Sequence, residues 1–232
     1  MPLEFESFAR TIEHQGWAIT PPVIDDAMVE SLRAAVSAVA ENGRGGARNL
    51  LELPAVASLA TSPAVRSLAS AVLGDGCFAT RALLFDKTPD ANWKVIWHQD
   101  LTITTRERAD VIGYGPWTDK AGVPHVQPPV SVLESMLAVR IHLDPCGAEN
   151  GPVRVLDGSH QRGRLSAEAI EELRRQQPER DCCVAQGGVL AFRPLIVHAS
   201  APARTPHHRR VIHIEFAAQA LPSPLEWHRE VA

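Results

Sequence analysis

The sequence predicts a mainly β fold with flanking helices (α+β): a jelly-roll, cupin-like barrel with helices in its N-terminal part. Two observations support this prediction. Short β-type segments separated by glycine and proline recur between residues 77 and 220, which is typical of a barrel rather than of alternating strands and helices. Residues 1–76 instead carry apolar side chains at helical spacing. We therefore expect a single domain over residues 1–232, with a mostly helical part (1–76) and a jelly-roll core (77–220).

Three helices are expected in the N-terminal part. The first covers residues 5–17, where apolar residues recur near helical spacing. The second begins at the capping residue Asp25 and ends at Asn42-Gly43. A shorter third helix runs from Pro63 to Gly74, which are typical first and last residues of a helix.

Period-two alternation begins after Gly76. Residues 77–87 and 93–101 are expected to form strands, and the second would place Lys94, His98 and Asp100 on one face. Residues 105–130 are rich in glycine and proline, so we expect a long, partly ordered loop of the kind that forms lids or binding loops. Further strands are expected at residues 137–143, 153–156, 182–185, 189–192, 195–198 and 211–216, with an amphipathic helix at 166–177.

Composition narrows the range of partners. The formal charge of −4 gives no reason to expect a nucleic-acid partner, and no apolar run is long enough to cross a bilayer. The chain starts with charged residues rather than an apolar targeting segment. Its four cysteines contain no CxxC pair, so we expect reduced thiols and a cytoplasmic protein. A small-molecule partner is expected, and the sequence leaves the oligomeric state open.

The strongest chemical signal is a set of two histidines and one carboxylate. His98 and Asp100 are two residues apart on an expected strand, and His198 ends another strand far along the chain. Two histidines and a carboxylate can hold Fe(II) on one face and leave the other positions open. Each residue alone has a simpler explanation, because His-x-Asp occurs by chance and a histidine in an apolar strand is often a core residue.

Arg209 strengthens the metal hypothesis. If residues 199–208 form a hairpin, Arg209 returns beside His198, where a guanidinium could bind a terminal carboxylate. A surface charge is the alternative, since Arg210 follows directly. Alternation along the strand places one of the two arginines inward, and the eleven-residue offset from His198 favours Arg209.

An ordered series of motifs resembles the phytanoyl-CoA dioxygenase family. The series is Trp97-His98-Gln99-Asp100, Arg140-Ile141-His142-Leu143-Asp144, Glu149-Asn150-Gly151-Pro152, Gly158-Ser159-His160, His198-Ala199-Ser200 and Arg209. The resemblance covers roughly residues 81–216. It implies a double-stranded β-helix and an Fe(II)- and 2-oxoglutarate-dependent dioxygenase.

The resemblance also implies roles for individual residues. His98, Asp100 and His198 would be the iron ligands, and Arg209 would bind the far carboxylate of 2-oxoglutarate with help from Ser200. The expected cofactors are Fe(II), 2-oxoglutarate as co-substrate and O₂, with ascorbate as an optional reductant. The expected reaction is hydroxylation of a small molecule with release of succinate and CO₂. Related halogenases replace the carboxylate ligand with a small residue, so the presence of Asp100 favours hydroxylation over chlorination.

Other candidates rest on position alone. His125, Gln127 and Trp117 belong to the expected loop and could line the substrate entrance, and Lys94 lies near the metal pair. A solvated loop position explains His125 and Gln127 equally well, and a surface lysine is the simpler interpretation of Lys94. Lys87 would suggest a bound carboxylate if it pointed inward, although a surface lysine is the simpler reading.

Three alternatives to hydroxylation stay open. The same cofactors could support desaturation, cyclisation or epimerisation. A non-catalytic cupin-like protein could bind a metal or a small acid, although the intact triad and arginine disfavour this. A cupin enzyme independent of 2-oxoglutarate would more often use three histidines.

Overall fold

The computed structural model describes residues 4–39 and 45–232. The helix end expected at Asn42-Gly43 lies outside the described residues. The helical elements are α1 (Phe5–Gln15), α2 (Asp26–Ser37), η1 (Leu50–Glu52), α3 (Pro54–Thr61), α4 (Pro63–Leu73), α5 (Val130–Glu134), η2 (Ala148–Asn150), η3 (Ser159–Arg162) and α6 (Ala167–Gln176). The strands are β1 (Trp17–Thr20), β2 (Gly46–Ala47), β3 (Phe78–Lys87), β4 (Val95–His98), β5 (Ile103–Thr104), β6 (Trp117–Lys120), β7 (Val123–Val126), β8 (Met136–His142), β9 (Val153–Val155), β10 (Arg180–Cys182), β11 (Val189–Phe192), β12 (His198–Ser200) and β13 (Arg209–Ala217).

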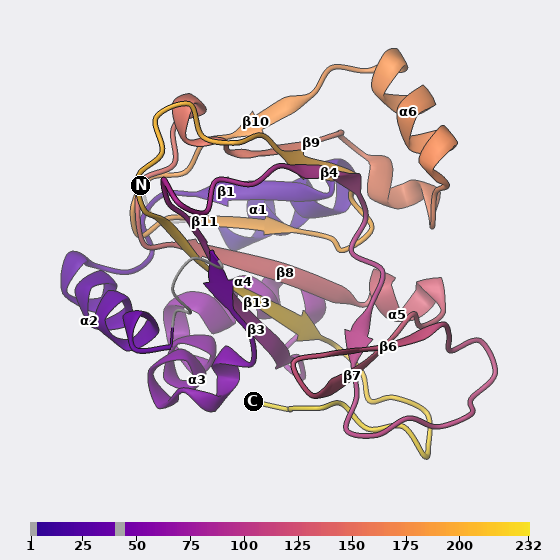
Figure 1. Ribbon diagram of the computed structural model, residues 1–232. Helices are drawn as coiled ribbons and strands as arrows, with labels where there is room; N and C mark the ends of the chain where they lie inside the picture. The colour runs from indigo at the N-terminus through magenta and orange to yellow at the C-terminus, as the bar shows by residue number, and fades with distance from the viewer. Residues whose placement is uncertain (1–3, 40–44) are drawn as a thin grey trace.

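Two antiparallel sheets face one another across a shared core (Figure 1). The major sheet has the strand order β1-β11-β8-β13-β3-β2, and the minor sheet has the order β10-β9-β12-β4. Val153 and Val155 of β9 pack against Leu190 and Phe192 of β11 between the sheets. This arrangement is the predicted jelly-roll barrel.

The N-terminal helices cover the outer face of the major sheet (Figure 1). Phe8 and Ile12 of α1 and Leu68 of α4 belong to the same buried cluster as Ile212 and Ile214 of β13. Because successive residues of a strand point to opposite faces, the residues between these isoleucines point into the barrel. The inward side of β13 carries Arg209, Val211, His213 and Glu215. The barrel interior is therefore strongly polar along this strand.

Several predicted ends agree with the structure. Asp25 caps α2 by accepting a hydrogen bond from the backbone N–H of Met28 at 2.8 Å. Ser166 caps α6 through the N–H of Ala169 at 3.2 Å. The third expected helix is α4, which begins at Pro63 and ends at Leu73, with Gly74 as its C-cap. Helix α3 was not expected, since no separate apolar pattern distinguishes it from α4.

Two segments differ from the prediction. Trp17 does not extend the first helix, because Gly16 adopts a left-handed conformation (φ 86°) and ends α1. Residues 17–20 then pair with β11 at the edge of the major sheet. The segment 105–130 is not a plain loop, because β6 and β7 form a hairpin that joins β5 in a three-stranded sheet. The glycine and proline residues of this segment masked the short strands.

The C-terminal residues return to the barrel. Trp227 is 1% exposed and packs edge-on against Phe78, with 6.3 Å between ring centroids. Val231 forms a β-bridge with Ala79 at the start of β3. Within the described part of the chain, no single helix has the length and hydropathy to cross a membrane; α3 and α4 meet that test only as a pair bent by 53°.

Candidate active site

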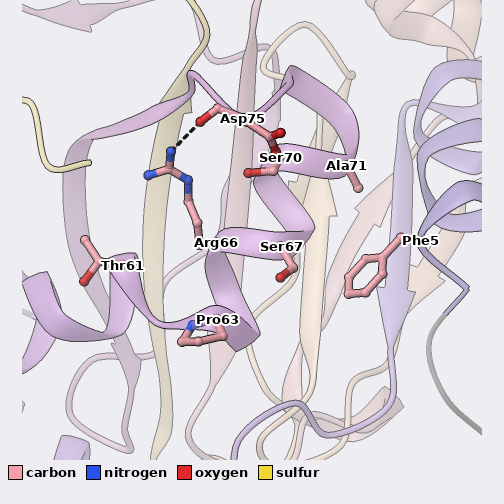
Figure 2. Close-up of a pocket in the computed structure, with 8 residues that line it drawn as sticks. All are labelled: Phe5, Thr61, Pro63, Arg66, Ser67, Ser70, Ala71 and Asp75. Carbon is pink, nitrogen blue, oxygen red and sulfur yellow. Dashed lines mark hydrogen bonds between the residues drawn. The ribbon is translucent and has the colours of Figure 1, made fainter.

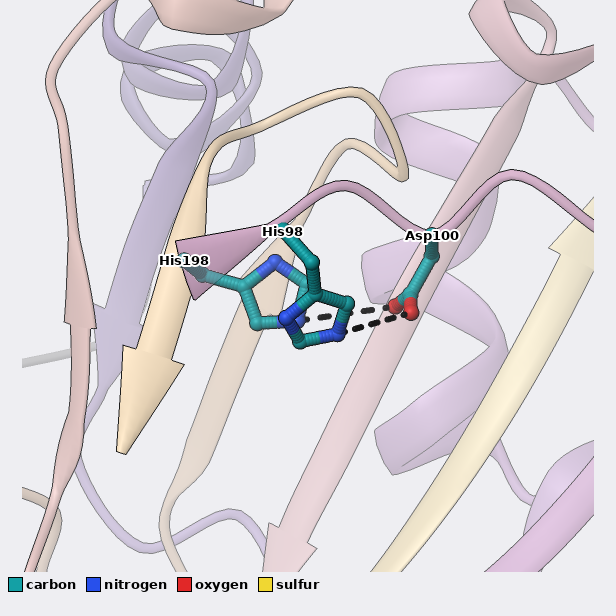
Figure 3. Close-up of side chains that lie close together, drawn as sticks. All are labelled: His98, Asp100 and His198. Carbon is teal, nitrogen blue, oxygen red and sulfur yellow. Dashed lines mark ion pairs between the residues drawn. The ribbon is translucent and has the colours of Figure 1, made fainter. Parts of the chain in front are cut away.

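The minor sheet brings the two histidines of the predicted triad together. His198 of β12 lies directly opposite His98 of β4, and their ring centroids are 4.2 Å apart. Each ring is oriented through Nδ1, which lies 2.8 Å from the carbonyl oxygen of Ile96 in His98 and 3.0 Å from that of Ile196 in His198. These contacts leave both Nε2 atoms directed at Asp100 (Figure 3). A histidine held through one nitrogen presents the other to a metal.

Asp100 completes the cluster from a position just after β4. Its carboxylate oxygens lie 3.6 Å from Nε2 of His98 and 3.7 Å from Nε2 of His198. The strand predicted for residues 93–101 is shorter than expected, so strand alternation alone does not place this carboxylate. The Asp100 backbone N–H is held by the carbonyl of Pro194 at 2.9 Å. The three side chains offer ligand atoms within 4.8 Å of one another, as one metal ion requires.

Gln99 fixes this segment from the opposite side. Its side chain is buried, donates to the carbonyls of Gly163 and Leu195, and accepts from the N–H of Leu165. Three hydrogen bonds tie the residue between His98 and Asp100 to two other loops. The sequence indicated only that Gln99 points away from the metal pair, so this positioning role was missed.

The charges of the cluster favour binding of a cation. Burial alone would raise the pKa of Asp100, but the nearby histidines outweigh it and hold the pKa well below its usual range. Burial lowers the pKa of His198 to about 4, so this ring is neutral. For His98, burial is opposed and outweighed by the hydrogen bond and charge of Asp100, which raise its pKa. An ionised carboxylate and a neutral histidine are the forms that ligate metals.

Arg209 lies inside the barrel, where the sequence placed it. Its side chain is 3% exposed and donates to the carbonyls of Asn150 and Gly151. Arg210 points to the opposite face and pairs with Asp144 at 2.8 Å. Lys87 is the register partner of Arg209 on β3 and is fully buried.

Lys87 connects Arg209 with the metal cluster. Its Nζ donates to the hydroxyl of Ser200 at 3.2 Å and to the carbonyl of Ala201. Burial, followed by repulsion from Arg209, lowers the pKa of Lys87 to about 7. The simpler sequence interpretation of Lys87 as a surface residue was therefore wrong.

The interior has donors that fit a bound acid. Among the described residues, Nε of Arg140 and Nε of Arg209 are buried donors without a hydrogen-bond partner, and the ring of His142, whose pKa is lowered by burial, has one further unpartnered N–H. A buried polar group without a partner costs about 1–3 kcal/mol. A ligand with carboxylates would accept from these donors and neutralise the adjoining cations. The residues therefore fit 2-oxoglutarate as well as iron.

A cavity of about 530 Å³ adjoins this chamber. Leu83 and Phe85 line it from the inward face of β3, and Trp93 lies 5.9 Å from Nζ of Lys87. Arg48 and Ala121 border it from outer loops. A hollow of this size next to Lys87 can hold a small molecule.

The remaining candidates occupy different environments. His125 is buried in β7, with Nδ1 2.9 Å from the carbonyl of Val123, and Trp117 packs in the apolar cluster around Trp227. Gln127 is half-buried, and Lys94 is exposed on the segment before β4. None of these four side chains belongs to the His98–Asp100–His198 cluster in the described structure.

A second hollow lies far from this chemistry. It has a volume of about 630 Å³ and lies between α1 and α4 on the outer side of the helices (Figure 2). Phe5 and Ala71 are on its wall, and Arg66 donates to the carbonyl of Asp75 at 2.6 Å. Without a cluster of reactive groups, it has the character of a surface groove.

A jelly-roll barrel with two histidines and one carboxylate in its mouth is the architecture of non-haem iron oxygenases. The family model "Phytanoyl-CoA dioxygenase" matches residues 12–211. The chain belongs to this family, whose members are Fe- and 2-oxoglutarate-dependent oxygenases. The expected fold class and enzyme class are thus confirmed.

Solved structures have the same fold. AviO1 from Streptomyces viridochromogenes Tue57 is 22% identical with a TM-score of 0.70, covering 96% of this chain and 98% of that one. The non-heme alpha ketoglutarate dependent carbocyclase SnoK from nogalamycin biosynthesis is 18% identical with a TM-score of 0.71, covering 91% and 83%. EctD from S. alaskensis with bound Fe is 18% identical with a TM-score of 0.69, covering 93% and 78%. No curated protein matches the sequence.

Proposed function

We propose that His98, Asp100 and His198 bind one Fe(II) and that the chain hydroxylates a small molecule with 2-oxoglutarate as co-substrate. The observation that carries the proposal is the convergence of these three side chains, with ligand atoms within 4.8 Å of one another, beside buried cations. When bound, iron and 2-oxoglutarate activate O₂ to remove hydrogen from the substrate, and succinate and CO₂ are released. Asp100 supplies the carboxylate ligand whose loss would favour chlorination.

Arg209 binds the far carboxylate of 2-oxoglutarate in this proposal. Its guanidinium is buried and has an unpartnered Nε, while Lys87 adds a second donor opposite it. Ser200 orients Lys87 through their 3.2 Å hydrogen bond. Because the site is buried and closed to bulk water, the attraction between these cations and a carboxylate is stronger there than at the protein surface.

The substrate occupies the cavity lined by Leu83, Phe85 and Trp93. This cavity adjoins Lys87 through Trp93, and its lining combines apolar side chains with the polar residues Arg48 and Asn49. His125, Gln127, Trp117 and Lys94 are proposed as more remote contacts or supports for the substrate. We also infer a cytoplasmic location, which is supported by four free cysteines, Cys77, Cys146, Cys182 and Cys183.

The proposal is tested by substrate-dependent succinate release. Wild-type protein with Fe(II), 2-oxoglutarate, ascorbate and a panel of small molecules should release succinate, and His98→Ala should not. The matched control is His207→Ala, which removes an exposed histidine. Product analysis then separates hydroxylation from cyclisation or epimerisation, two outcomes named for proteins with similar folds. Full turnover by His98→Ala would contradict the metal assignment.

A further inference from the structure

Arg140 is a buried cation on the inner face of β8 to which neither the sequence nor the proposed mechanism assigns a role. Its side chain is 7% exposed and forms no ion pair with a carboxylate within the described ranges 4–39 and 45–232. Its Nε has no hydrogen-bond partner. Burying an unpaired guanidinium is costly, so its position calls for a compensating anion.

Neighbouring side chains fix the orientation of the Arg140 guanidinium. One terminal nitrogen donates to Nδ1 of His213 at 3.1 Å, so this ring is neutral and carries its hydrogen on Nε2. That nitrogen lies 3.3 Å from Oε1 of Glu215, which also pairs with Arg81. The guanidinium carbon lies 4.9 Å from the centre of the Phe85 ring. A charge held from two sides is preorganised to bind a ligand.

The level of Arg140 in the barrel separates it from Arg209. Arg140 is the register partner of His213, which lies four residues beyond Arg209 on β13. Four residues of strand span about 13 Å. Because the Arg140 guanidinium is hydrogen-bonded to His213, it stays at the level of His213 along the barrel. It therefore forms a binding group separate from Arg209.

The part of the barrel that holds Arg140 and His213 is connected to the metal cluster through Phe192. The ring of Phe192 lies 4.9 Å from that of His198 and 6.0 Å from that of His213, measured between centroids. Arg140 is therefore linked to the predicted iron ligand His198 through two rings, those of His213 and Phe192, whereas Arg209 lies at the start of β13, paired in register with Lys87. A 2-oxo dicarboxylate spanning this chamber has one carboxylate near each end.

We propose that Arg140 is a positioning residue that binds the metal-proximal carboxylate of 2-oxoglutarate, the group next to the keto carbon. This inference rests on the proposed function. The chain then holds the co-substrate at both ends: Arg209 and Lys87 bind the far carboxylate, and Arg140 sets the orientation of the keto-acid end on the metal. His213 acts through Arg140 by fixing its guanidinium.

Two ligands distinguish the two ends. 2-Oxobutyrate keeps the keto-acid end but lacks the far carboxylate. Fe(II)-loaded protein is titrated anaerobically with either acid, at saturating iron, while the visible charge-transfer band of the chelate is followed. Arg140→Met should weaken binding of both acids by about tenfold or more, because a hydrogen bond between charged groups is lost. Arg209→Met should weaken binding of 2-oxoglutarate and leave the affinity for 2-oxobutyrate within about twofold of that of wild type.

Control variants make the result specific. Arg210→Met removes a neighbouring arginine that faces outward and should leave both affinities unchanged. Arg140→Lys keeps the charge but not the planar, forked guanidinium. Its affinity for each acid should therefore lie between that of wild type and that of Arg140→Met. The proposal is overturned if Arg140→Met leaves both affinities within about twofold of the wild-type values, or if it weakens binding of 2-oxoglutarate but not of 2-oxobutyrate.

Thermal unfolding gives an independent readout. Without 2-oxoglutarate, Arg140→Met should unfold at a temperature no lower than wild type, because an unpaired buried cation has been removed. The increase in Tm on adding 2-oxoglutarate should shrink. A purely structural arginine would instead lower the Tm and leave that increase unchanged. A wild-type protein that binds iron but forms no band with 2-oxoglutarate would overturn the proposed function itself, and this inference with it.

Discussion

Positive charge predominates at the level of single residues inside the barrel. Lys87, Arg140 and Arg209 are buried without an acidic partner among the described residues, whereas Glu215 is already paired with Arg81. This imbalance explains why burial and Arg209 lower the pKa of Lys87 to about 7. The protonation of Lys87 should therefore respond to an incoming carboxylate.

We predict that binding of 2-oxoglutarate takes up a proton at pH 8. Lys87 is mostly neutral there in the free protein, and a bound carboxylate raises its pKa again, so up to about one proton is bound. Affinity should fall as the pH rises above about 7. Calorimetric titration of the iron-loaded protein in two buffers of different ionisation enthalpy measures the uptake. Lys87→Met should abolish it, and wild type without proton uptake would show that Lys87 is not part of the site.

We predict that iron affinity falls in acid with a slope of about tenfold per pH unit. Protons compete with the metal at His98, whose pKa is raised by Asp100, whereas His198, with a pKa of about 4, stays neutral. One proton is therefore displaced per iron between about pH 5 and the pKa of His98. The measurement is anaerobic Fe(II) binding as a function of pH. A pH-independent affinity in wild type would contradict the ligand assignment, and His207→Ala should keep the wild-type slope.

Single residues also show where sequence reasoning reached its limit. The sequence singled out His98, His198 and Arg209 through strand alternation, a hairpin return and the family resemblance; the structure brings the two histidines together and buries Arg209, and their roles stay predictions. An inward Lys87 was raised only as the less simple interpretation, and Arg140 was given no role of its own, because a charged residue on a strand normally faces water. Here helices bury the other face of the major sheet, so alternation points these cations inward. No local pattern reveals which face of a strand is covered by distant helices.

Short elements around the barrel mouth set the positions of these side chains. Asp100 follows β4, and Gln99 ties that segment to the loops at Gly163 and Leu195. The turn between β8 and β9 supplies the carbonyl of Gly151 to Arg209. Eight strands were expected from the sequence, whereas the described residues form thirteen, and the ends of the expected strands also shifted, since short strands are defined by partners from other parts of the chain.

We predict that Gly151→Ala destabilises the fold by about 2–4 kcal/mol and weakens 2-oxoglutarate binding. Gly151 has a positive φ of 58°, and an added Cβ would collide with the backbone carbonyl of Ala201. The control is Gly158→Ala, where φ is 68° but the nearest atom would lie at 3.7 Å. It shares the left-handed strain of about 1 kcal/mol without the collision. Equal losses in the two variants, measured by chemical unfolding, would contradict this account.

The whole molecule is organised around the major sheet. The N-terminal strand β1 pairs with β11 at the edge of this sheet, and the C-terminal Val231 bridges Ala79 of β3. Both ends of the described chain therefore contribute to one body, and the single domain expected over residues 1–232 stays our proposal. The return of the C-terminal segment was missed because residues 221–232 carry no strand or helix pattern.

We predict that the protein unfolds in one cooperative transition and that Trp227→Ala lowers its stability by about 3–5 kcal/mol. Trp227 is almost fully buried against Phe78 and donates to the carbonyl of Gln219 at 3.0 Å. The control Ile112→Ala changes a fully exposed residue and should have an effect within about 0.5 kcal/mol. Chemical unfolding followed by fluorescence and circular dichroism checks both claims. Two separate transitions would contradict the single-domain proposal.

The central claim is that His98, Asp100 and His198 hold an iron to which 2-oxoglutarate binds. Anaerobic titration of Fe(II)-loaded wild type with 2-oxoglutarate tests it most directly. The account predicts a weak visible charge-transfer band that requires both components and is lost in His98→Ala, which removes a histidine ligand. Iron demonstrably bound to wild type without such a band would contradict the account.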